Sequence, residues 1–203
     1  MTDLALGMFR GCSNISVLSL PKELKAIQAQ ALYGCKSLTG VLSLPESLTG
    51  IGDSAFYGCT GLEGVDIPES VIALGTSAFS GCSGLTSVEI ASEKTIIGYG
   101  AFSCCSNLTS VTIPSGVTNI GRCAFWDCSG LKSVVFLGVP PSGLSNSSLL
   151  SYGRASYLRE YGKDWLKSLG INSFTGYGQG EKPVVEIVSS AIRENDPTVM
   201  DVV

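Results

Sequence analysis

The chain has 203 residues, of which 44% are hydrophobic and 15% are charged, and its formal net charge is −4. This length is enough for one well-buried core, the composition is too apolar for disorder, and no run approaches the ~20 apolar residues of a membrane-spanning helix. Lys and Arg do not cluster, so nucleic acid and anionic membranes are poor partners. Histidine is absent, which excludes His-dependent nucleophilic machinery and His-ligated metal sites.

One phrase of nine residues occurs four times, as IGDSAFYGC (51–59), LGTSAFSGC (74–82), IGYGAFSCC (97–105) and IGRCAFWDC (120–128). The cysteine that ends it belongs to a longer series with spacings of 23, 24, 23, 23 and 23 residues, formed by Cys12, Cys35, Cys59, Cys82, Cys105 and Cys128. A register kept over six units predicts a repeat protein. The single longer spacing indicates an extra residue around Gly40 and Val41.

The first part of each unit is predicted to be a strand. Segments such as LEGVDI (62–67), LTSVEI (85–90) and LTSVTI (108–113) alternate apolar residues with small or polar ones, as a strand with one buried face does. The proline that follows in most units, for example Pro68, ends the strand because it cannot donate to a ladder.

The rest of each unit is predicted to contain a second short extended segment and a turn. The segment V-x-x-I-G ends on a glycine that permits a tight or positive-φ turn, at positions 52, 75, 98 and 121. The A-F-x-G-C segment then predicts a short helical or turn-like return, with Ala and Phe pointing inward and Gly58 or Gly81 bending the chain before the cysteine. One unit cannot bury its own apolar residues, so we expect units to stack ~4.8 Å apart with parallel strands, as a solenoid.

The repeat resembles the BspA-like, or treponemal-type, class of leucine-rich repeat. LTSVTIPSGVTNIGRCAFWDCSGL (108–131) and ESVIALGTSAFSGCSGLTSV (69–88) match its 23-residue consensus, and the resemblance covers residues 4–136. It implies a β-rich leucine-rich-repeat solenoid, a right-handed superhelix of about six 23-residue units, capped by a C-terminal helix. One unit departs from the consensus at Ala91, Lys94 and Cys104, and we expect its turn geometry to differ.

We predict three parts: the repeat array over 1–136, a cap over 137–175, and a linker with the first strands of a further β domain over 176–203. The cap would contain an amphipathic helix over about 154–169, whose apolar face carries Leu158, Tyr161, Trp165 and Leu169. A helix here would cover the open end of a solenoid. The alternative is an aromatic ligand site around Tyr157, Tyr161 and Trp165.

The cysteines and carboxylates are interpreted as structural. Equivalent side chains of a solenoid point the same way, which is a poor geometry for disulfides, and a buried free cysteine packs as a small hydrophobe. Cys104 and Cys123 lie off the series and are the candidates for exposed thiols, but a thiol enzyme would lack its base. Glu63, Asp66, Glu69 and Glu89 fall at outward positions typical of a solvated face. We expect no catalytic residue, no metal and no cofactor.

A partner-binding surface is expected on the outward strand positions. Stacking aligns them into rows, and the candidate residues are Ser19, Ser43, Asp66, Ser87, Glu89, Ser110, Thr112, Ser133 and Val135. Extended faces of this kind are what solenoids use for recognition. These rows could equally be merely solvated, because no aromatic or Arg hot spot stands out on them.

The resemblance implies a non-enzymatic protein-binding or adhesion module of a bacterial surface or secreted protein, with host, matrix or other cell-surface proteins as partners. The expected location is therefore extracellular or at the cell surface. The alternative is a structural spacer or targeting module of a larger exported protein, possibly an enzyme whose catalytic domain lies elsewhere.

Overall fold

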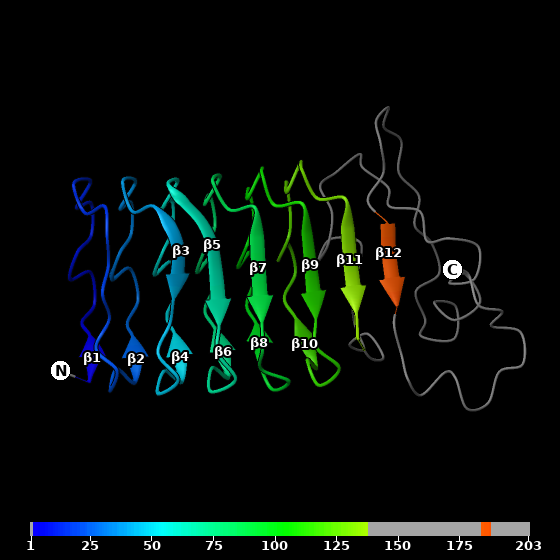
Figure 1. Ribbon diagram of the computed structural model, residues 1–203, viewed down its shortest axis with the longest axis horizontal. Coiled ribbons are helices and arrows are strands. Elements are labelled where there is room, and N and C mark those ends of the chain that lie inside the picture. Colours follow the sequence, from blue (N-terminus) through cyan, green and yellow to red (C-terminus); the bar gives the residue numbers. More distant parts are fainter. Residues whose placement is uncertain (1, 138–183, 188–203) are drawn as a thin grey trace, which may run out of the picture.

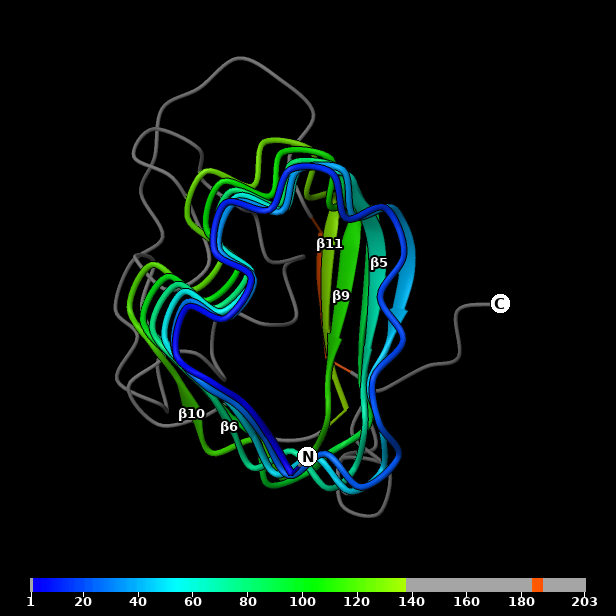
Figure 2. The same cartoon turned by 90° about the vertical axis from the view of Figure 1, so that its left-hand side faces the viewer.

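The computed structural model of the chain describes residues 2–137 and 184–187, and every strand in these ranges belongs to one of two six-stranded parallel sheets. The chain winds through both sheets in each repeat, so that successive coils stack along one axis (Figure 1). Viewed along that axis, the coils superimpose, with one sheet on each side of a shared interior (Figure 2). The predicted solenoid is therefore confirmed, whereas the predicted helix over 154–169 lies outside the described residues.

The narrow sheet is made of two-residue strands. Its order follows the chain: β1 (Asp3–Leu4), β2 (Ala26–Ile27), β4 (Gly50–Ile51), β6 (Ala73–Leu74), β8 (Ile96–Ile97) and β10 (Asn119–Ile120). The broad sheet has longer strands: β3 (Gly40–Ser43), β5 (Leu62–Ile67), β7 (Ser87–Ile90), β9 (Ser110–Ile113), β11 (Ser133–Phe136) and β12 (Val184–Ile187).

The predicted strands are present on the broad sheet. The segment LEGVDI is β5, and the later equivalents begin two residues further on, at Ser87 and Ser110. The extra residue also lies where the spacing placed it. The register shifts between Gly40 and Val41, since Gly40 pairs with Leu62 and Val41 pairs with Gly64.

Strands were also predicted within residues 176–203, and β12 is present there. It pairs in parallel with β11, with Ser133 opposite Val184, and so adds one more strand to the broad sheet. The assignment of residues 176–203 to a further domain concerns mostly residues outside the described ranges and stays a prediction.

The interior is a set of columns, each built from one repeat position. Four phenylalanines stack face to face, with ring centroids 5.0 Å apart for Phe56 and Phe79, 5.4 Å for Phe79 and Phe102, and 5.5 Å for Phe102 and Phe125. Their interplanar angles do not exceed 7°, and all four rings are buried. The A-F-x-G-C segments form turns and no helix within residues 2–137.

The glycines that follow the narrow sheet have a different role from the one predicted. Gly52, Gly75, Gly98 and Gly121 do not have positive φ, so of the two predicted alternatives, a tight turn and a positive-φ turn, the second is wrong for them. Instead, each lies against the backbone of the preceding coil. A Cβ on Gly75 would lie 2.6 Å from the backbone N of Asp53, and one on Gly98 would lie 2.5 Å from the carbonyl oxygen of Leu74. These glycines therefore permit close stacking of coils.

Left-handed backbone does occur, in two columns and at Gly40. The residue before each repeat cysteine has a φ between 57° and 73°, and the column is Gly11, Gly34, Gly58, Gly81, Cys104 and Asp127. The predicted bends at Gly58 and Gly81 are thus confirmed. Cys104 keeps the same left-handed geometry without being glycine, so the expectation of a different turn is wrong at this position. A second column, four residues earlier, has φ between 54° and 61° and comprises Gly7, Gln30, Ser54, Ser77, Gly100 and Cys123. The sequence analysis missed it.

The atypical unit around Lys94 keeps the register of the sheets. Lys94 is exposed, and the buried place is taken by Thr95, whose hydroxyl donates to the carbonyl oxygen of Val71 at 2.6 Å. Ile96 then pairs with Ala73, as the repeat requires. The turn absorbs the change because a threonine hydroxyl can be buried when it is hydrogen-bonded.

Replacing Gly75 with alanine tests the close approach of coils. We expect the G75A substitution to lower the free energy of unfolding by roughly 1–3 kcal/mol, because the added Cβ forces neighbouring backbone apart. The matched control is G50A in β4, where a Cβ meets nothing within 4 Å and φ is not positive. Urea unfolding measures both variants. Equal effects of the two substitutions would contradict this account.

Candidate functional site

The candidate partner-binding residues lie mostly on the outer face of the broad sheet. Side chains at the intervening positions, such as Leu42 and Val65, are buried, so the alternation along each strand turns the candidates outward. Pairing across the sheet aligns Ser43 with Asp66 and Asp66 with Glu89. We call the outward-facing candidates on the strands of this sheet the broad-sheet row. Its members are Ser43, Asp66, Ser87, Glu89, Ser110, Thr112, Ser133 and Val135.

Not every candidate is equally placed on this row. Ser19 is exposed but belongs to no strand, since the first coil contributes no strand to the broad sheet among the described residues. At the other end, Ser133 and Val135 are only partly exposed. The most accessible part of the row therefore runs from β3 to β9.

The centre of the row carries a pair of like charges. Asp66 and Glu89 are directly paired on β5 and β7, and both side chains are exposed. Paired positions on neighbouring strands lie ~4.8 Å apart, so the two carboxylates repel one another. Since the row contains no Lys or Arg, it offers an acidic centre flanked by small uncharged side chains.

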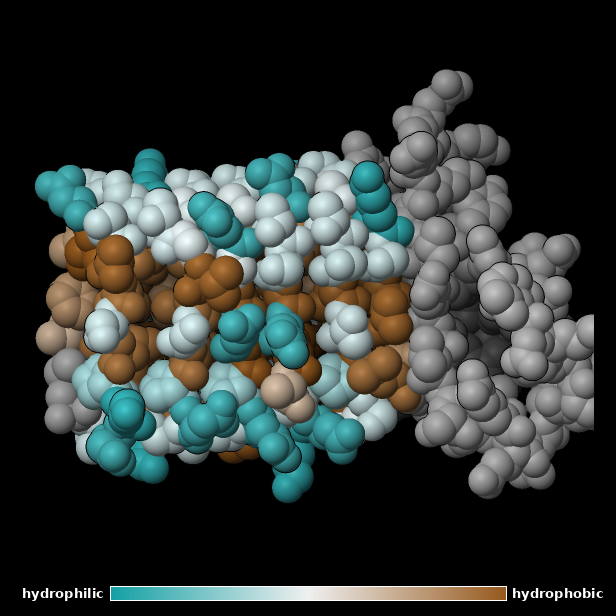
Figure 3. All heavy atoms as spheres, in the orientation of Figure 1, coloured by the Kyte–Doolittle hydropathy of each residue, from teal (hydrophilic) through white to brown (hydrophobic). Residues whose placement is uncertain are grey.

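The structure adds two exposed valines that the sequence analysis did not select. Val17 and Val41 are 79% and 58% exposed, and Val41 pairs with Gly64. A Cβ on Gly64 would lie 3.2 Å from a Val41 methyl and 3.3 Å from the Ser87 hydroxyl. The side chains of Val41 and Ser87 therefore approach from the two neighbouring strands over this glycine. Counting one repeat back from Gly64 identifies Val41, and one longer step of 24 residues back from Val41 identifies Val17. Figure 3 shows hydrophobic residues among polar ones on the face that it presents.

The repeat cysteines form a column of free thiols, as predicted. Five of these thiols donate a hydrogen bond to the backbone carbonyl of the repeat phenylalanine or leucine in the preceding coil. The S···O distances are 3.0–3.3 Å, and the five are Cys35, Cys59, Cys82, Cys105 and Cys128. Burial, followed by the neighbouring Cys35 thiol, raises the pKa of Cys59 to about 12. Burial likewise raises the pKa of Cys82 well above its ordinary value. These thiols are therefore structural.

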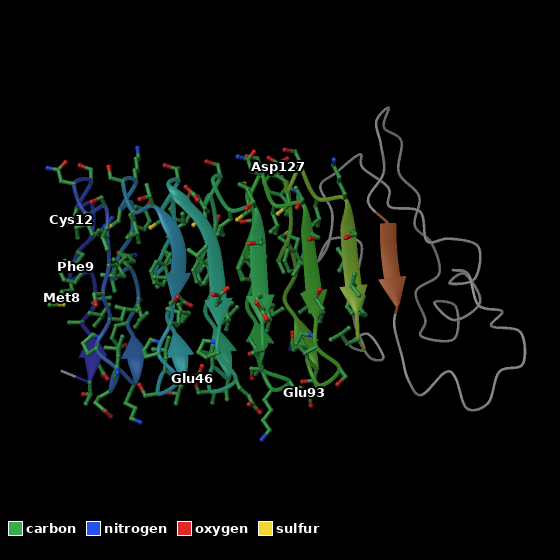
Figure 4. All side chains as sticks on the ribbon, in the orientation of Figure 1. Met8, Phe9, Cys12, Glu46, Glu93 and Asp127 are labelled. Atoms are coloured by element: carbon green, nitrogen blue, oxygen red, sulfur yellow. The ribbon has the colours of Figure 1, made fainter. Side chains whose placement is uncertain are left out.

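Cys12 is the exception in the column. It is exposed, because no coil precedes it among the described residues, and it lies with Met8 and Phe9 at the N-terminal end of the stack (Figure 4). The expectation that all six repeat cysteines are packed is thus wrong for this one.

The two cysteines outside the column are partly exposed, as predicted. Burial raises the pKa of Cys104, and the Asp127 carboxylate raises it further. A hydrogen bond with Cys123 raises the pKa of the Tyr99 hydroxyl. The raised pKa keeps the Cys104 thiol protonated, which disfavours its use as a nucleophile.

Within residues 2–137 and 184–187, no group of three or more Cys, Asp or Glu side chains is arranged to hold a metal ion. The same part of the chain contains no helix with the length and apolar character needed to cross a membrane.

Alkylation of the native protein tests the assignment of thiols. We expect iodoacetamide to modify Cys12, Cys104 and Cys123, because they are at least partly exposed, and to leave Cys59, Cys82 and Cys105 unmodified. Peptide mass spectrometry gives the extent of modification at each site. The control is the urea-unfolded chain, in which all these thiols should react. Native labelling of Cys82 as fast as that of Cys12 would rule out the buried column.

The raised pKa of Cys59 also predicts an alkaline loss of stability. The folded thiol keeps a proton that the unfolded thiol, with its ordinary pKa of 9.0, loses. The contribution of this raised pKa to the free energy of unfolding is complete below about pH 9 and is lost as the pH rises toward 12. We therefore expect C59A to lose less free energy of unfolding than the wild type between about pH 8 and about pH 11. Urea unfolding at both pH values measures this difference, and an unchanged pH dependence would contradict it.

Parallel strands from equivalent positions of a 23-residue repeat make the protein a parallel β-solenoid. The model of the "BspA type Leucine rich repeat region" matches residues 2–136 in six copies. The chain belongs to this family.

Solved structures of bacterial leucine-rich repeat proteins are similar to the chain. The Treponema pallidum protein TpLRR is 29% identical, with a TM-score of 0.69 over 87% of this chain and 80% of its own. A Eubacterium ventriosum protein is 22% identical, with a TM-score of 0.60 over 98% of this chain and 49% of its own. A leucine-rich cell surface protein from Faecalibacterium prausnitzii is 20% identical, with a TM-score of 0.51 over all of this chain and 62% of its own. No curated protein sequence shows significant similarity.

Proposed function

We propose that the array is a non-catalytic protein-binding module of a bacterial cell-surface or secreted protein, and that it recognises its partner through the broad-sheet row. The observation that carries this proposal is the alignment of exposed, mostly small side chains across adjacent paired strands from β3 to β9. A flat row of this kind lets a partner approach several strands at once. The Faecalibacterium relative described as a cell surface protein supports the location.

The composition of the row favours a protein partner with basic and apolar groups. Asp66 and Glu89 supply uncompensated negative charge at the centre, and Val41 supplies exposed apolar area beside it. Nucleic acid would be repelled by these carboxylates. Complementary charge also accelerates encounter with a basic partner.

Charge reversal at the centre of the row tests the proposal. We expect the double variant D66K/E89K to weaken binding by roughly tenfold or more, because the favourable charge contact becomes repulsive. The measurement is biolayer interferometry of the full chain against immobilised fibronectin, laminin and collagen, together with binding to cultured epithelial cells.

The matched control is E46K/E69K. Glu46 and Glu69 are also exposed, occupy equivalent positions of adjacent units and carry the same charge, but they follow the strand-ending prolines. Figure 4 places Glu46 at the lower end of the stack, away from the centre of the broad sheet. Binding unaffected by D66K/E89K, or equally reduced in both variants, would overturn the role of the row. An array that binds none of these probes would favour the spacer alternative.

A further inference from the structure

A second row runs along the turns of successive coils. It consists of the residue that follows each repeat phenylalanine or leucine, and we call it the turn row: Arg10, Tyr33, Tyr57, Ser80, Ser103 and Trp126. Backbone bonds fix its register. The N–H of Gly58 donates to the Ser80 carbonyl at 2.8 Å, and that of Cys104 donates to the Trp126 carbonyl at 2.7 Å. Consecutive members therefore stand one coil apart.

The N-terminal half of the turn row is an uninterrupted stack. The Arg10 guanidinium carbon lies 5.1 Å from the centroid of the Tyr33 ring. The Tyr33 and Tyr57 rings stack with centroids 4.8 Å apart and planes 7° from parallel. One face of Tyr57 is thus covered by Tyr33, while the other is directed toward the next coil, where the residue is Ser80.

The stack is interrupted for two coils. Ser80 and Ser103 occupy the positions at which further rings would continue it, and the next large side chain is Trp126. At the usual spacing of ~4.8 Å, the positions of Tyr57 and Trp126 are ~14 Å apart. Tyr57 is 38% and Trp126 is 37% exposed. Two aromatic side chains therefore flank a stretch of small hydroxyl residues.

These hydroxyls are buried and incompletely satisfied. The Ser103 hydroxyl donates to the Ser80 hydroxyl at 2.8 Å, and the two residues are 9% and 6% exposed. Among the described residues, neither hydroxyl makes another hydrogen bond, so the Ser80 proton has no acceptor there. A buried hydroxyl proton without an acceptor is costly, and native proteins usually provide a partner for it.

A third hydroxyl converges on the same point. A Cβ on Gly100 would lie 3.3 Å from the Ser103 hydroxyl and 3.4 Å from the Ser77 hydroxyl. Gly100 has no side chain to cover these groups, and its φ of 59° disfavours one. Two hydroxyls thus lie beside a bare glycine, and one of them, that of Ser103, is hydrogen-bonded to the third, that of Ser80.

We propose that the turn row between Tyr57 and Trp126 binds a neutral saccharide. The C–H face of a sugar ring would pack on the exposed aromatic faces. The hydroxyls of the sugar would accept a hydrogen bond from the Ser80 hydroxyl and form further hydrogen bonds with the Ser77 and Ser103 hydroxyls. A purely aromatic ligand would leave the Ser80 proton unmatched. From Tyr57 to Trp126, the turn row has no charged side chain that could pair with an ionic ligand. The site is separate from the broad-sheet row and does not depend on the function proposed for it.

Isothermal titration of the full chain with maltohexaose, cellohexaose, mannohexaose and chitohexaose tests the proposal. We expect at least one of these oligosaccharides to bind, and W126A and Y57A each to weaken its binding by about tenfold. Y33L is the matched control, because it changes the same row one coil further away and keeps an apolar contact on Tyr57. It should change the affinity by less than about twofold.

The double variant S80A/S103A separates a ligand site from a purely structural hydroxyl pair. It removes both partners of a buried hydrogen bond, so the thermal stability should stay close to that of the wild type while saccharide affinity falls. Absence of binding by all four oligosaccharides at millimolar concentration would overturn the proposal. So would wild-type affinity in S80A/S103A and W126A. Binding of N-acetyltryptophanamide at this row, without any oligosaccharide, would assign the site to aromatic ligands instead.

Discussion

The structure depends on the requirement that each residue stack on its own equivalent one coil away. Strands in a sheet are separated by ~4.8 Å, so a buried side chain must be complementary to a copy of itself at that distance. Phenylalanine meets this requirement by parallel stacking, as Phe56, Phe79 and Phe102 do. Cysteine meets it because a thiol can donate to a carbonyl of the preceding coil. The nine-residue phrase recurs because each of its positions has to satisfy this condition.

The same requirement acts on the backbone. Gly75 lies so close to the preceding coil that a Cβ on it would be 2.6 Å from the backbone nitrogen of Asp53. The backbone of the turns also has to be identical in every coil, whatever the residue. Cys104 and Asp127 therefore adopt the left-handed conformation that glycine adopts at Gly58. Left-handed backbone disfavours non-glycine residues, and the hydrogen bonds between coils, such as that from Cys104 to Trp126, offset this cost.

Much of this fold could be predicted from the sequence, because the period identifies the inward positions. The strand alternation, the extra residue at Gly40 and the free thiols are all consequences of spacing and residue type. The role of Gly75 could not be predicted, since its closest contact is with a residue in another coil. Nor could the left-handed backbone of Gln30 and Ser77, because these residue types occur equally in other conformations. Thr95 occupies the interior position that the period assigns to Lys94, and the period alone does not indicate this shift by one residue.

The candidate sites were only partly predictable, for a related reason. The period shows which outward residues align, and the broad-sheet row was found in that way. It does not show which aligned residues are chemically unusual, because this depends on burial and hydrogen bonding in three dimensions. Ser80 and Ser103 illustrate the difference, since in the sequence they are two of many turn serines. In the structure they interrupt an aromatic stack and are buried together with an unmatched proton. In a solenoid whose interior must repeat, specificity for a ligand can arise only at positions that depart from the repeat, and the turn row departs from it at these two serines.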